Sequence, residues 1–484
     1  MNKAIITNAY FYRLDPKQWR FKQPYPPLGT ILAASVLRNL GLTLVFQDNS
    51  LEKDINKTRD SIINEKPRYV IIYDDGFNYL TKMCLSVMRE ATFKIIKEAK
   101  ENKCVVTVCN SDASDHYEKY FDAGADFIIR GEGEETLSEL INSLEKGSPV
   151  DTIKGIVWRK DHTTVVNEQR PVIKNLDALP LPAWDMVDIE AYRSIWKKNH
   201  SYFSLNIATT RGCPYKCNWC AKPIYGNRYN SRSPEQVLNE IEFLLKSYQP
   251  DHFWICDDIF GLKPGWLNEF SSIVRQKQLK IKYKIQSRAD LLLEENTLQA
   301  LANSGAETVW VGAESGSQKV LDAMDKGVTV AQIEKATSLM KARGIKVGYF
   351  LQFGYTGELR EDINQTIQLV LRNMPDEIGI SVSYPLPGTK FYDRVKSELR
   401  EKQNWVDSDD LDLMFHSTYP KQFYKNLQRH VHQLYRIQKA KLAIRAILKR
   451  PSQVNLRFVK SILSGVFHFI LYLKSEREVR KSLA

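Results

Sequence analysis

Short apolar runs alternate with amphipathic segments over residues 1–148. The runs are rich in β-branched and aromatic residues, and they lie at 4–7, 42–46, 69–73, 105–109 and 127–129. Segments with helical periodicity separate them, such as 30–40, which Gly41 closes, and 82–100. Strands that alternate with helices predict a doubly wound, Rossmann-like parallel sheet, which binds ligands beyond the carboxyl ends of its strands.

The pattern changes twice after this first domain. Residues 149–200 form a predicted linker, with a β-hairpin over 155–160 and 163–167 and a proline-rich connector. The alternation resumes over 201–399, where strands are expected at 205–208, 253–256, 281–286, 308–311, 346–351 and 378–382. Six such units predict a partial (β/α)6 barrel of the TIM type, followed by a helical region over 400–484.

The charge is concentrated in that last region. The chain of 484 residues has 69 Lys and Arg against 57 Asp and Glu, a net charge of +12. Residues 421–484 hold 15 of the bases and two of the acids, a local charge of +13, which leaves the first 420 residues at −1. The basic character therefore belongs to the C-terminal region alone.

The cysteine content and the N-terminus indicate a reducing compartment. Seven cysteines, three of them within eight positions, do not suit a disulfide framework. The first residues form a predicted strand without the features of a signal peptide, and no apolar run reaches the roughly 18 to 20 residues that span a bilayer. We expect a cytoplasmic protein in which cysteines serve a metal or redox role.

The strongest chemical signal is the cysteine motif Cys213-x3-Cys217-x2-Cys220, directly after the first strand of the predicted barrel. Three close thiolates can hold three irons of a cubane and leave the fourth iron open. A zinc knuckle is the alternative, but it needs a fourth ligand at short spacing, and neither His200 nor Cys256 has that spacing. We therefore expect an iron–sulfur cluster.

The motif resembles the signature of the radical S-adenosylmethionine (SAM) superfamily. The resemblance implies that Cys213, Cys217 and Cys220 ligate a 4Fe-4S cluster, whose open iron binds SAM and whose reduction cleaves SAM to a 5′-deoxyadenosyl radical. Segments 256–260, 287–290 and 312–317 are similar to strand ends of the branch that adds an N-terminal cobalamin-binding domain.

Several strand-end residues are candidates for SAM and the substrate. We assign Glu314 and Ser315 to the ribose, Arg288 to the carboxylate of SAM, and Asp257 with Asp258, as catalytic candidates, to its amine or the substrate. Each charged residue has an alternative interpretation in which it only braces a loop. The sequence at 355–358, Tyr-Thr-Gly-Glu, departs from the Pro-Gly-Glu usual in this family.

The N-terminal domain resembles the cobalamin-binding module of the same branch. Loops 73–76 and 109–114 are expected to face the corrin, and the candidate binding residues are Asp75, Asn110, Ser111, Gly131 and Glu132. The first histidine is His116, so a histidine below the cobalt is not expected. Loop 109–114 departs from the usual Gly-Gly-Pro-His, and a vestigial domain is the alternative.

These observations predict a cobalamin-dependent radical SAM methyltransferase that C-methylates an unactivated carbon. Cobalamin-associated cyclisation or rearrangement is the first alternative. A tRNA methylthiotransferase would need a second cluster, for which Cys84, Cys104 and Cys109 are available, and a non-enzymatic nucleic-acid sensor would use the basic tail. We expect a small-molecule or lipid substrate, flavodoxin or ferredoxin as electron donor, and no nucleic-acid partner.

The C-terminal region also suggests a location. Residues 462–473 are nearly all apolar and are flanked by Arg457, Lys460 and Lys474. This stretch is too short to span a bilayer but suits a helix lying on anionic lipid. The alternative is a helix that packs its apolar face on the barrel and exposes its lysines.

Overall fold

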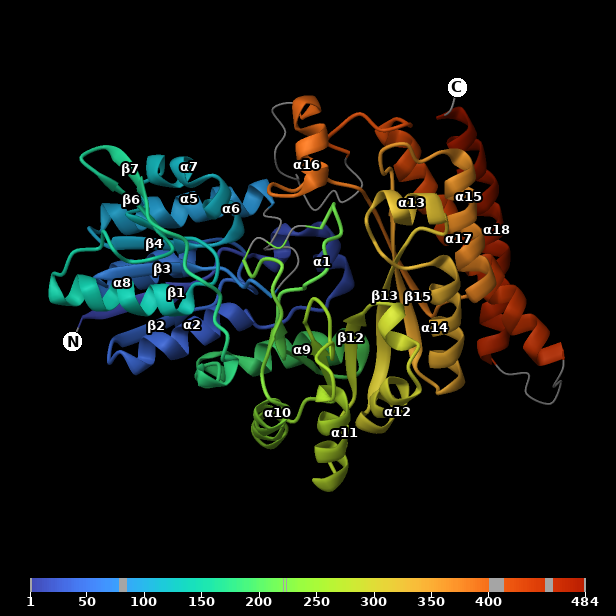
Figure 1. Ribbon diagram of the computed structural model, residues 1–484, viewed down its shortest axis with the longest axis horizontal. Coiled ribbons are helices and arrows are strands. Elements are labelled where there is room, and N and C mark those ends of the chain that lie inside the picture. The colour runs from blue at the N-terminus through green and yellow to red at the C-terminus, as the bar shows by residue number, and fades with distance from the viewer. Residues whose placement is uncertain are drawn as a thin grey trace.

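The structure is a computed structural model that describes residues 2–77, 85–220, 222, 224–399, 413–448 and 456–482. Two sheets lie next to each other, the N-terminal one on the left of Figure 1 and the second one in the centre. Two long C-terminal helices cover the side of the second sheet that is remote from the first.

The first sheet has seven strands in the order β2-β1-β3-β4-β5-β6-β7. The pairs among β1 to β5 are parallel, and the chain reverses its direction of winding between β1 and β3. This confirms the predicted doubly wound sheet. Its strands are β1 (Lys3–Thr7), β2 (Thr43–Gln47), β3 (Tyr69–Tyr73), β4 (Val105–Cys109), β5 (Phe127–Ile129), β6 (Ile156–Lys160) and β7 (Thr163–Val166).

Helices cover both faces of this sheet, which explains why its strands are almost continuously apolar. Ile5, Val70 and Ile72 belong to one core, and Ile6 and Ile71 to the core of the opposite face. The first face carries α3 (Asn56–Glu65), α5 (Ser86–Glu101) and α7 (Tyr117–Asp122), and the second carries α2 (Leu28–Asn39) and α8 (Glu134–Lys146).

The predicted hairpin is present, and it extends the N-terminal sheet. Strand β6 pairs antiparallel with β5, with Ile156 opposite Ile129, and β7 pairs antiparallel with β6. The segment that follows it contains α9 (Ile189–His200), whose Trp196 is fully buried and donates to Pro24 O over 2.7 Å. The hairpin therefore lies at the edge of the N-terminal sheet, whereas the proline-rich segment, through Trp184 Nε1 to Glu240, and α9 are built into the interface between the two domains.

The second sheet has six parallel strands in the order β15-β14-β13-β12-β11-β8, which confirms the predicted six-unit partial barrel. The strands are β8 (Ser204–Ile207), β11 (His252–Ile255), β12 (Tyr283–Ser287), β13 (Ala306–Glu314), β14 (Lys346–Phe353) and β15 (Glu377–Val382). The helices between them are α10 (Pro234–Tyr248), α11 (Trp266–Gln276), α12 (Glu295–Ser304), α14 (Val330–Ala342) and α15 (Arg360–Asn373).

Local capping signals fix the ends of these helices. Ser233 caps α10 ahead of Pro234, and Thr329 forms a capping box with Gln332 at the start of α14. The remaining elements are short: α1 (Pro16–Phe21), α6 (Ser111–Asp115), β9 (Thr210–Arg211), β10 (Asn230–Ser231), α13 (Gln318–Ala323), α16 (Lys390–Val395), and the 3-10 turns η1 (Tyr12–Leu14), η2 (Leu176–Ala178), η3 (Trp184–Met186), η4 (Asp290–Leu292) and η5 (Lys396–Glu398).

Two helices, α17 (Lys421–Leu448) and α18 (Leu456–Lys481), form the described part of the C-terminal region. Phe423, Leu427 and Val431 of α17 are buried in the barrel core, and α18 packs along α17. Within the described residues, no helix combines the length and the apolar content needed to cross a membrane.

Candidate active site

The cysteine motif lies on a loop at the carboxyl end of β8, the first barrel strand. It follows the short strand β9, which pairs antiparallel with β10. Gly212 has a φ of 77°, and a Cβ at this position would collide with Arg228 O. The turn that leads into Cys213 therefore requires glycine.

The three thiols are close enough to influence one another. Burial raises the pKa of Cys213 and raises that of Cys220 to about 12, and the neighbouring thiols add to both shifts. No group of three or more His, Cys, Asp or Glu among the described residues converges on a single metal ion. A cubane binds each cysteine through a different iron, so its ligands surround a cluster and need not converge on one point.

Asn218, within the motif, anchors the loop to the rest of the barrel. Its Nδ2 donates to Ala323 O over 2.7 Å, and its Oδ1 accepts from Tyr355 Oη over 2.8 Å. Its backbone N–H donates to Met324 O over 3.0 Å. Nothing in the cysteine spacing marks Asn218 as an anchor, and its partner Tyr355 lies 137 positions away, so neither role could be predicted from the motif.

Asp257 and Asp258 follow β11 and differ in their surroundings. Asp257 is buried and accepts from Thr209 N over 2.7 Å, from Thr210 N over 3.0 Å and from Thr209 Oγ1. Burial raises the pKa of Asp257 to about 6 although these hydrogen bonds oppose the shift. Asp258 is only partly buried, and its charge adds to the raised pKa of Cys213 and of Cys220. Asp257 thus positions the start of the cysteine loop, whereas Asp258 lies beside the thiols.

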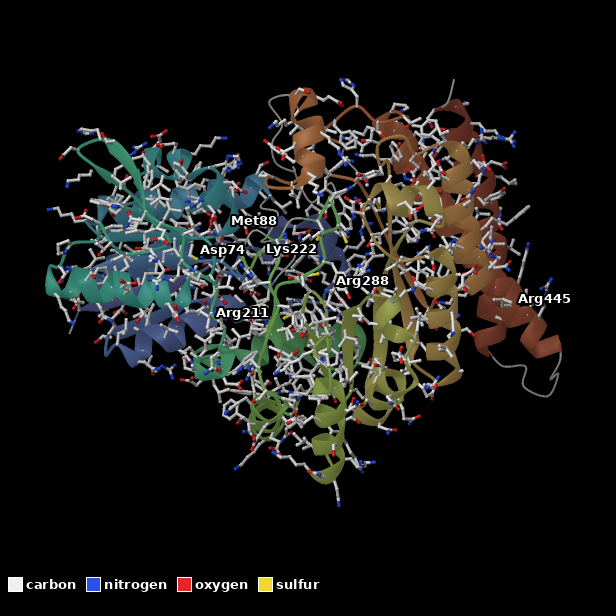
Figure 2. The ribbon with its side chains drawn as sticks, in the orientation of Figure 1. Asp74, Met88, Arg211, Lys222, Arg288 and Arg445 are labelled. Atoms are coloured by element: carbon white, nitrogen blue, oxygen red, sulfur yellow. The ribbon has the colours of Figure 1, made fainter. Side chains whose placement is uncertain are left out.

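Arg288 brings a positive charge to the cysteine loop. Its Nη1 lies 3.9 Å from Cys217 Sγ, and its guanidinium stacks 3.7 Å above the ring of Tyr215. Asp290 holds it through Nε over 3.0 Å. Figure 2 shows Arg288 and Lys222 near the centre of the molecule, between the two sheets.

Glu314 ends β13 with left-handed backbone geometry, at a φ of 55°. Its Oε1 accepts from Lys326 Nζ over 2.8 Å, and both side chains are buried. Burial alone would lower the pKa of Lys326, but Glu314 and Cys217 outweigh this effect and raise it. Glu314 is therefore linked to the cysteine loop through Lys326, a residue that no sequence pattern singled out.

Ser315 is fully buried beside Glu314. Its Oγ lies 3.0 Å from Thr366 Oγ1 and accepts from Ser317 N over 3.1 Å. The hydroxyl therefore shapes the loop after β13, and its assignment to the SAM ribose stays a prediction.

A buried ion-pair network joins the N-terminal domain to the cysteine loop. Arg211, two residues before Cys213, donates from Nη2 to Glu134 Oε1 over 2.8 Å and from Nη1 to Glu134 Oε2 over 3.2 Å. Arg211 Nη1 also donates to Glu132. All three side chains are at most 5% exposed. Glu132, predicted to bind a cofactor, is thus engaged in docking the two domains, and its cofactor role stays a prediction.

The other candidates in the N-terminal domain lie at the carboxyl ends of its strands. Asp75 Oδ1 accepts from Gly29 N and from Phe77 N, each over 3.0 Å. Asn110 caps α6 through Ala113 N and donates to Asp74 Oδ2 over 2.9 Å. Ser111 Oγ is buried and has no hydrogen-bond partner among the residues that the structure describes. Gly131, with a φ of 78°, approaches the backbone of Ile224 beyond the cysteine motif.

These residues fit the groups that the resemblance implies. Three thiols on one loop, with Lys222, Arg288 and Lys326 electrostatically coupled to them, suit an anionic iron–sulfur cluster. Glu314, Arg288 and Asp258 lie around the same loop, where SAM would meet the open iron. The hydroxyls of Ser111 and Tyr12, at the end of the first sheet, have no partner within the described part of the chain and suit a polar ligand such as a corrin side chain.

Comparison with known proteins supports this interpretation. Residues 207–370 match the family model described as the radical SAM superfamily. An uncharacterized methyltransferase of Pyrococcus horikoshii is 29% identical over 290 residues, which cover 59% of this chain and 62% of that protein. The match thus spans less than two thirds of this relative.

A second relative is the anaerobic magnesium-protoporphyrin IX monomethyl ester cyclase of Rubrivivax gelatinosus. It is 26% identical over 396 residues, which cover 79% of this chain and 69% of the cyclase.

The solved structure of the cobalamin-dependent S-adenosylmethionine radical enzyme OxsB, with aqua-cobalamin and S-adenosylmethionine bound, has the same fold. It superposes with a TM-score of 0.74 and 20% identity, covering 98% of this chain and 72% of OxsB. The chain therefore carries, in residues 207–370, the domain of the radical SAM enzymes, and over nearly its whole length it has the fold of a cobalamin-dependent member of that superfamily.

Proposed function

We propose that this enzyme cleaves SAM at a 4Fe-4S cluster and, with cobalamin, C-methylates an unactivated carbon of a small-molecule or lipid substrate. The observation that carries the proposal is the buried pairing of Arg211 with Glu132 and Glu134, which fixes the cysteine loop against the end of the N-terminal sheet. When bound, the cluster with SAM would supply the means to remove a hydrogen atom from the substrate carbon, and methylcobalamin would supply the methyl group.

The residues of the chain bind, orient and enclose these groups. Cys213, Cys217 and Cys220 would hold the cluster. Arg288 and Glu314 would orient the carboxylate and the ribose of SAM, with Asp258 close to its amine. Asn218 and Asp257 keep the cysteine loop in place through their hydrogen bonds to Ala323 and to Thr209 and Thr210. Flavodoxin or ferredoxin is the proposed electron donor.

The test is anaerobic reconstitution with iron, sulfide and cobalamin, followed by SAM and a reductant. We expect about four irons per chain, bound cobalamin and release of 5′-deoxyadenosine. Cys217→Ala should lose 5′-deoxyadenosine formation, whereas the matched control Cys104→Ala should keep it, because Cys104 is buried at the start of β4 in the N-terminal domain. If the fully reconstituted native enzyme forms no 5′-deoxyadenosine, the proposal fails.

Radical cyclisation is the second candidate function. The similarity to the cyclase of Rubrivivax gelatinosus favours it. Product analysis separates the two: methylation adds a carbon that can be traced from labelled SAM, whereas ring formation removes hydrogen and adds no carbon.

A methylthiotransferase would require a second cluster in the N-terminal domain. Cys104 precedes β4 and Cys109 ends it, so these two thiols are separated by the length of a strand. Cys84 lies outside the described residues. A content of about eight irons per chain would support this alternative, and about four would exclude it.

We also propose that α18 rests on an anionic membrane surface. Small and polar residues face α17: Gly465 approaches Ala440, and His468 Nδ1 lies 2.6 Å from Gln433 Oε1. The large apolar residues point outward, with Leu463 65%, Val466 57%, Phe467 58% and Ile470 62% exposed. Such a helix leaves an apolar face without a partner among the described residues.

The net charge of the C-terminal region indicates what covers the apolar face of α18. The apolar face lies in the region that holds 15 bases and two acids, and the combination of an apolar helix face with a basic surround favours an anionic lipid surface over a neutral one. Figure 2 shows Arg445 at the outer end of these helices, remote from Arg211 and Arg288. Membrane contact would thus leave the cysteine loop free.

A further inference from the structure

Two adjoining hollows lie between the domains and along the concave face of the barrel. The smaller, of about 170 Å³, is lined by Asn8 and Asp75 of the N-terminal domain and by Asn206 of the barrel. The larger, of about 490 Å³, follows the inner side of β11 to β15. Gln23, Trp254 and Lys284 line both, so the hollows meet at these side chains.

Lys284, on β12, is the charged group at this junction. Its Nζ lies 5.3 Å from the ring centroids of both Tyr25 and Trp254. Among the described residues, no carboxylate lies within ion-pair distance of it, whereas Lys346 in the same hollow pairs with Glu307 at 2.9 Å. Burial lowers the pKa of Lys284 and also that of His252 nearby, to about 4, so His252 is neutral. Glu377, in the same hollow, attracts the Lys284 charge only from beyond ion-pair distance. A partly buried ammonium group without a close counter-ion is costly unless a ligand supplies one.

The walls beyond Lys284 are flat and aromatic. Trp310 and Phe350 stack with centroids 4.7 Å apart and an angle of 28°. Trp310 lies flat because Gly348 is beneath it: a Cβ there would come within 2.5 Å of the indole. On the other side of the junction, Asn206 is 2% exposed, and its Oδ1 accepts no hydrogen bond from any described residue. The two hollows together, called the chamber below, therefore offer the Lys284 cation, a flat apolar wall of Trp310 and Phe350, and a hydrogen-bond acceptor, Asn206 Oδ1.

We propose that Lys284 binds an anionic group of the substrate, a carboxylate or a phosphate, and that the flat apolar body of the substrate lies along Trp254, Trp310 and Phe350. This inference rests on the proposed function for the reaction at the other end of the substrate. The anion completes the ion pair that Lys284 lacks, and the rings supply contact area for a planar body. Asn206 Oδ1 would accept from a hydroxyl or N–H of the substrate.

The test uses simple planar probes on the full-length protein, by isothermal titration calorimetry. We expect 2-naphthoate or 1-naphthyl phosphate to bind the native protein, and Lys284→Met to weaken that binding by about tenfold or more, as expected for loss of a charged partner. Lys284→Arg should restore binding, and Lys280→Met, at an exposed position that lines neither hollow, should bind as the native protein does. The uncharged 2-naphthamide should bind the native protein and Lys284→Met equally.

The two anionic probes identify the preferred group, because the tighter one shows whether the site is built for a carboxylate or a phosphate. Equal binding of both anions to native protein and Lys284→Met would overturn the proposal, and so would no binding of either to the native protein. If the midpoint of thermal unfolding of Lys284→Met is at least as high as that of the native protein, a loss of binding in the variant does not result from unfolding. Probe binding needs neither cluster nor SAM, so its failure is distinct from a failure of the proposed chemistry.

Discussion

Arg211 and Glu134 form a two-point contact, Nη2 to Oε1 over 2.8 Å and Nη1 to Oε2 over 3.2 Å, that crosses from the barrel to the N-terminal domain. Glu134 begins helix α8, and Arg211 stands two residues before Cys213, the first cysteine of the motif. A shift of the N-terminal domain would therefore be transmitted directly to the cysteine loop. The distance between the two proposed cofactors depends on this contact.

Loss of the Arg211 guanidinium should destabilise the protein strongly. Arg211→Met leaves Glu132 and Glu134 buried without their shared partner, which typically costs about 3–5 kcal/mol. Urea unfolding of the metal-free protein measures this. The matched control Arg38→Met removes an exposed pair with Asp185 and should cost less than about 1 kcal/mol. Adding Glu132→Gln and Glu134→Gln to Arg211→Met should recover part of the lost stability. If Arg211→Met and Arg38→Met have the same free energy of unfolding, this account is wrong.

Glu314→Gln should weaken SAM binding while leaving the iron content unchanged. The substitution removes a charged acceptor near the cysteine loop and its ion pair with Lys326, and we expect about a tenfold loss of SAM affinity. Calorimetric titration of SAM into the reconstituted protein checks this. Glu307→Gln, at the other end of β13, is the matched control and should bind SAM normally, because Glu307 pairs with Lys346 far from the loop. Native affinity in Glu314→Gln would exclude the ribose assignment.

Glu358 should make the stability of the protein fall as the pH rises. Burial raises the pKa of Glu358 to about 8, although Gly354 N donates to it over 2.6 Å. The folded state keeps a proton that the unfolded state releases near the ordinary pKa of about 4.3. Between these two pKa values, each rise of one pH unit lowers the free energy of unfolding by about 1.4 kcal/mol. The stabilising contribution of Glu358 is therefore lost once the pH passes its pKa in the folded state.

Glu358→Gln should remove this contribution. We expect the variant to lose less stability than the native protein between about pH 5 and pH 8, measured by urea unfolding at several pH values. Glu361→Gln, an exposed position on α15, should keep the native slope. Parallel curves for Glu358→Gln and the native protein would show that Glu358 is ionised in the fold.

Two serines on the outer face of α18 should weaken membrane binding. Phe467→Ser with Ile470→Ser removes two exposed apolar side chains, each worth about 1.5–3 kcal/mol when buried, so binding should fall by about tenfold or more. Co-sedimentation with vesicles of phosphatidylglycerol and phosphatidylcholine measures it. Phe243→Ser, an exposed residue of α10, is the control.

The same protein samples distinguish a lipid from a nucleic-acid partner of α18. Unchanged vesicle binding by the double variant would refute the membrane proposal. Salt-dependent binding to RNA without vesicle binding would point instead to a nucleic-acid partner.

The architecture could be predicted from the sequence because buried parallel strands leave a strong pattern. Tyr69–Tyr73 is apolar throughout and is buried throughout, and both β3 and β4 begin and end where the runs do. The cysteine loop was predictable for a similar reason, since three cysteines at close spacing have few other uses. The hairpin at Ile156–Lys160 and Thr163–Val166 was also predictable, but not its pairing with β5, because strand pairing depends on tertiary contacts.

The residues around the cysteines were harder to predict. Arg211, Glu134, Asn218 and Lys326 act through partners that are distant in the sequence: Lys326 pairs with Glu314 across 12 positions, and Arg211 with Glu134 across 77. A single sequence carries no record of such pairings. The outward orientation of the apolar face of α18 was open for the same reason, because periodicity shows that a face exists and not which way it points.

Gly348, beneath Trp310, determines how close the indole can lie to the strand that lines the chamber. A single methyl group at Gly348 would lie within 2.5 Å of the indole and would push the ring toward the space that the substrate is proposed to occupy. At Gly379, on β15, a Cβ would only touch the far edge of the same ring, at 3.4 Å, so this position does not restrain the indole. The size of molecule that this hollow admits can therefore be set by one backbone position, so selectivity can change in evolution without altering the cysteine loop.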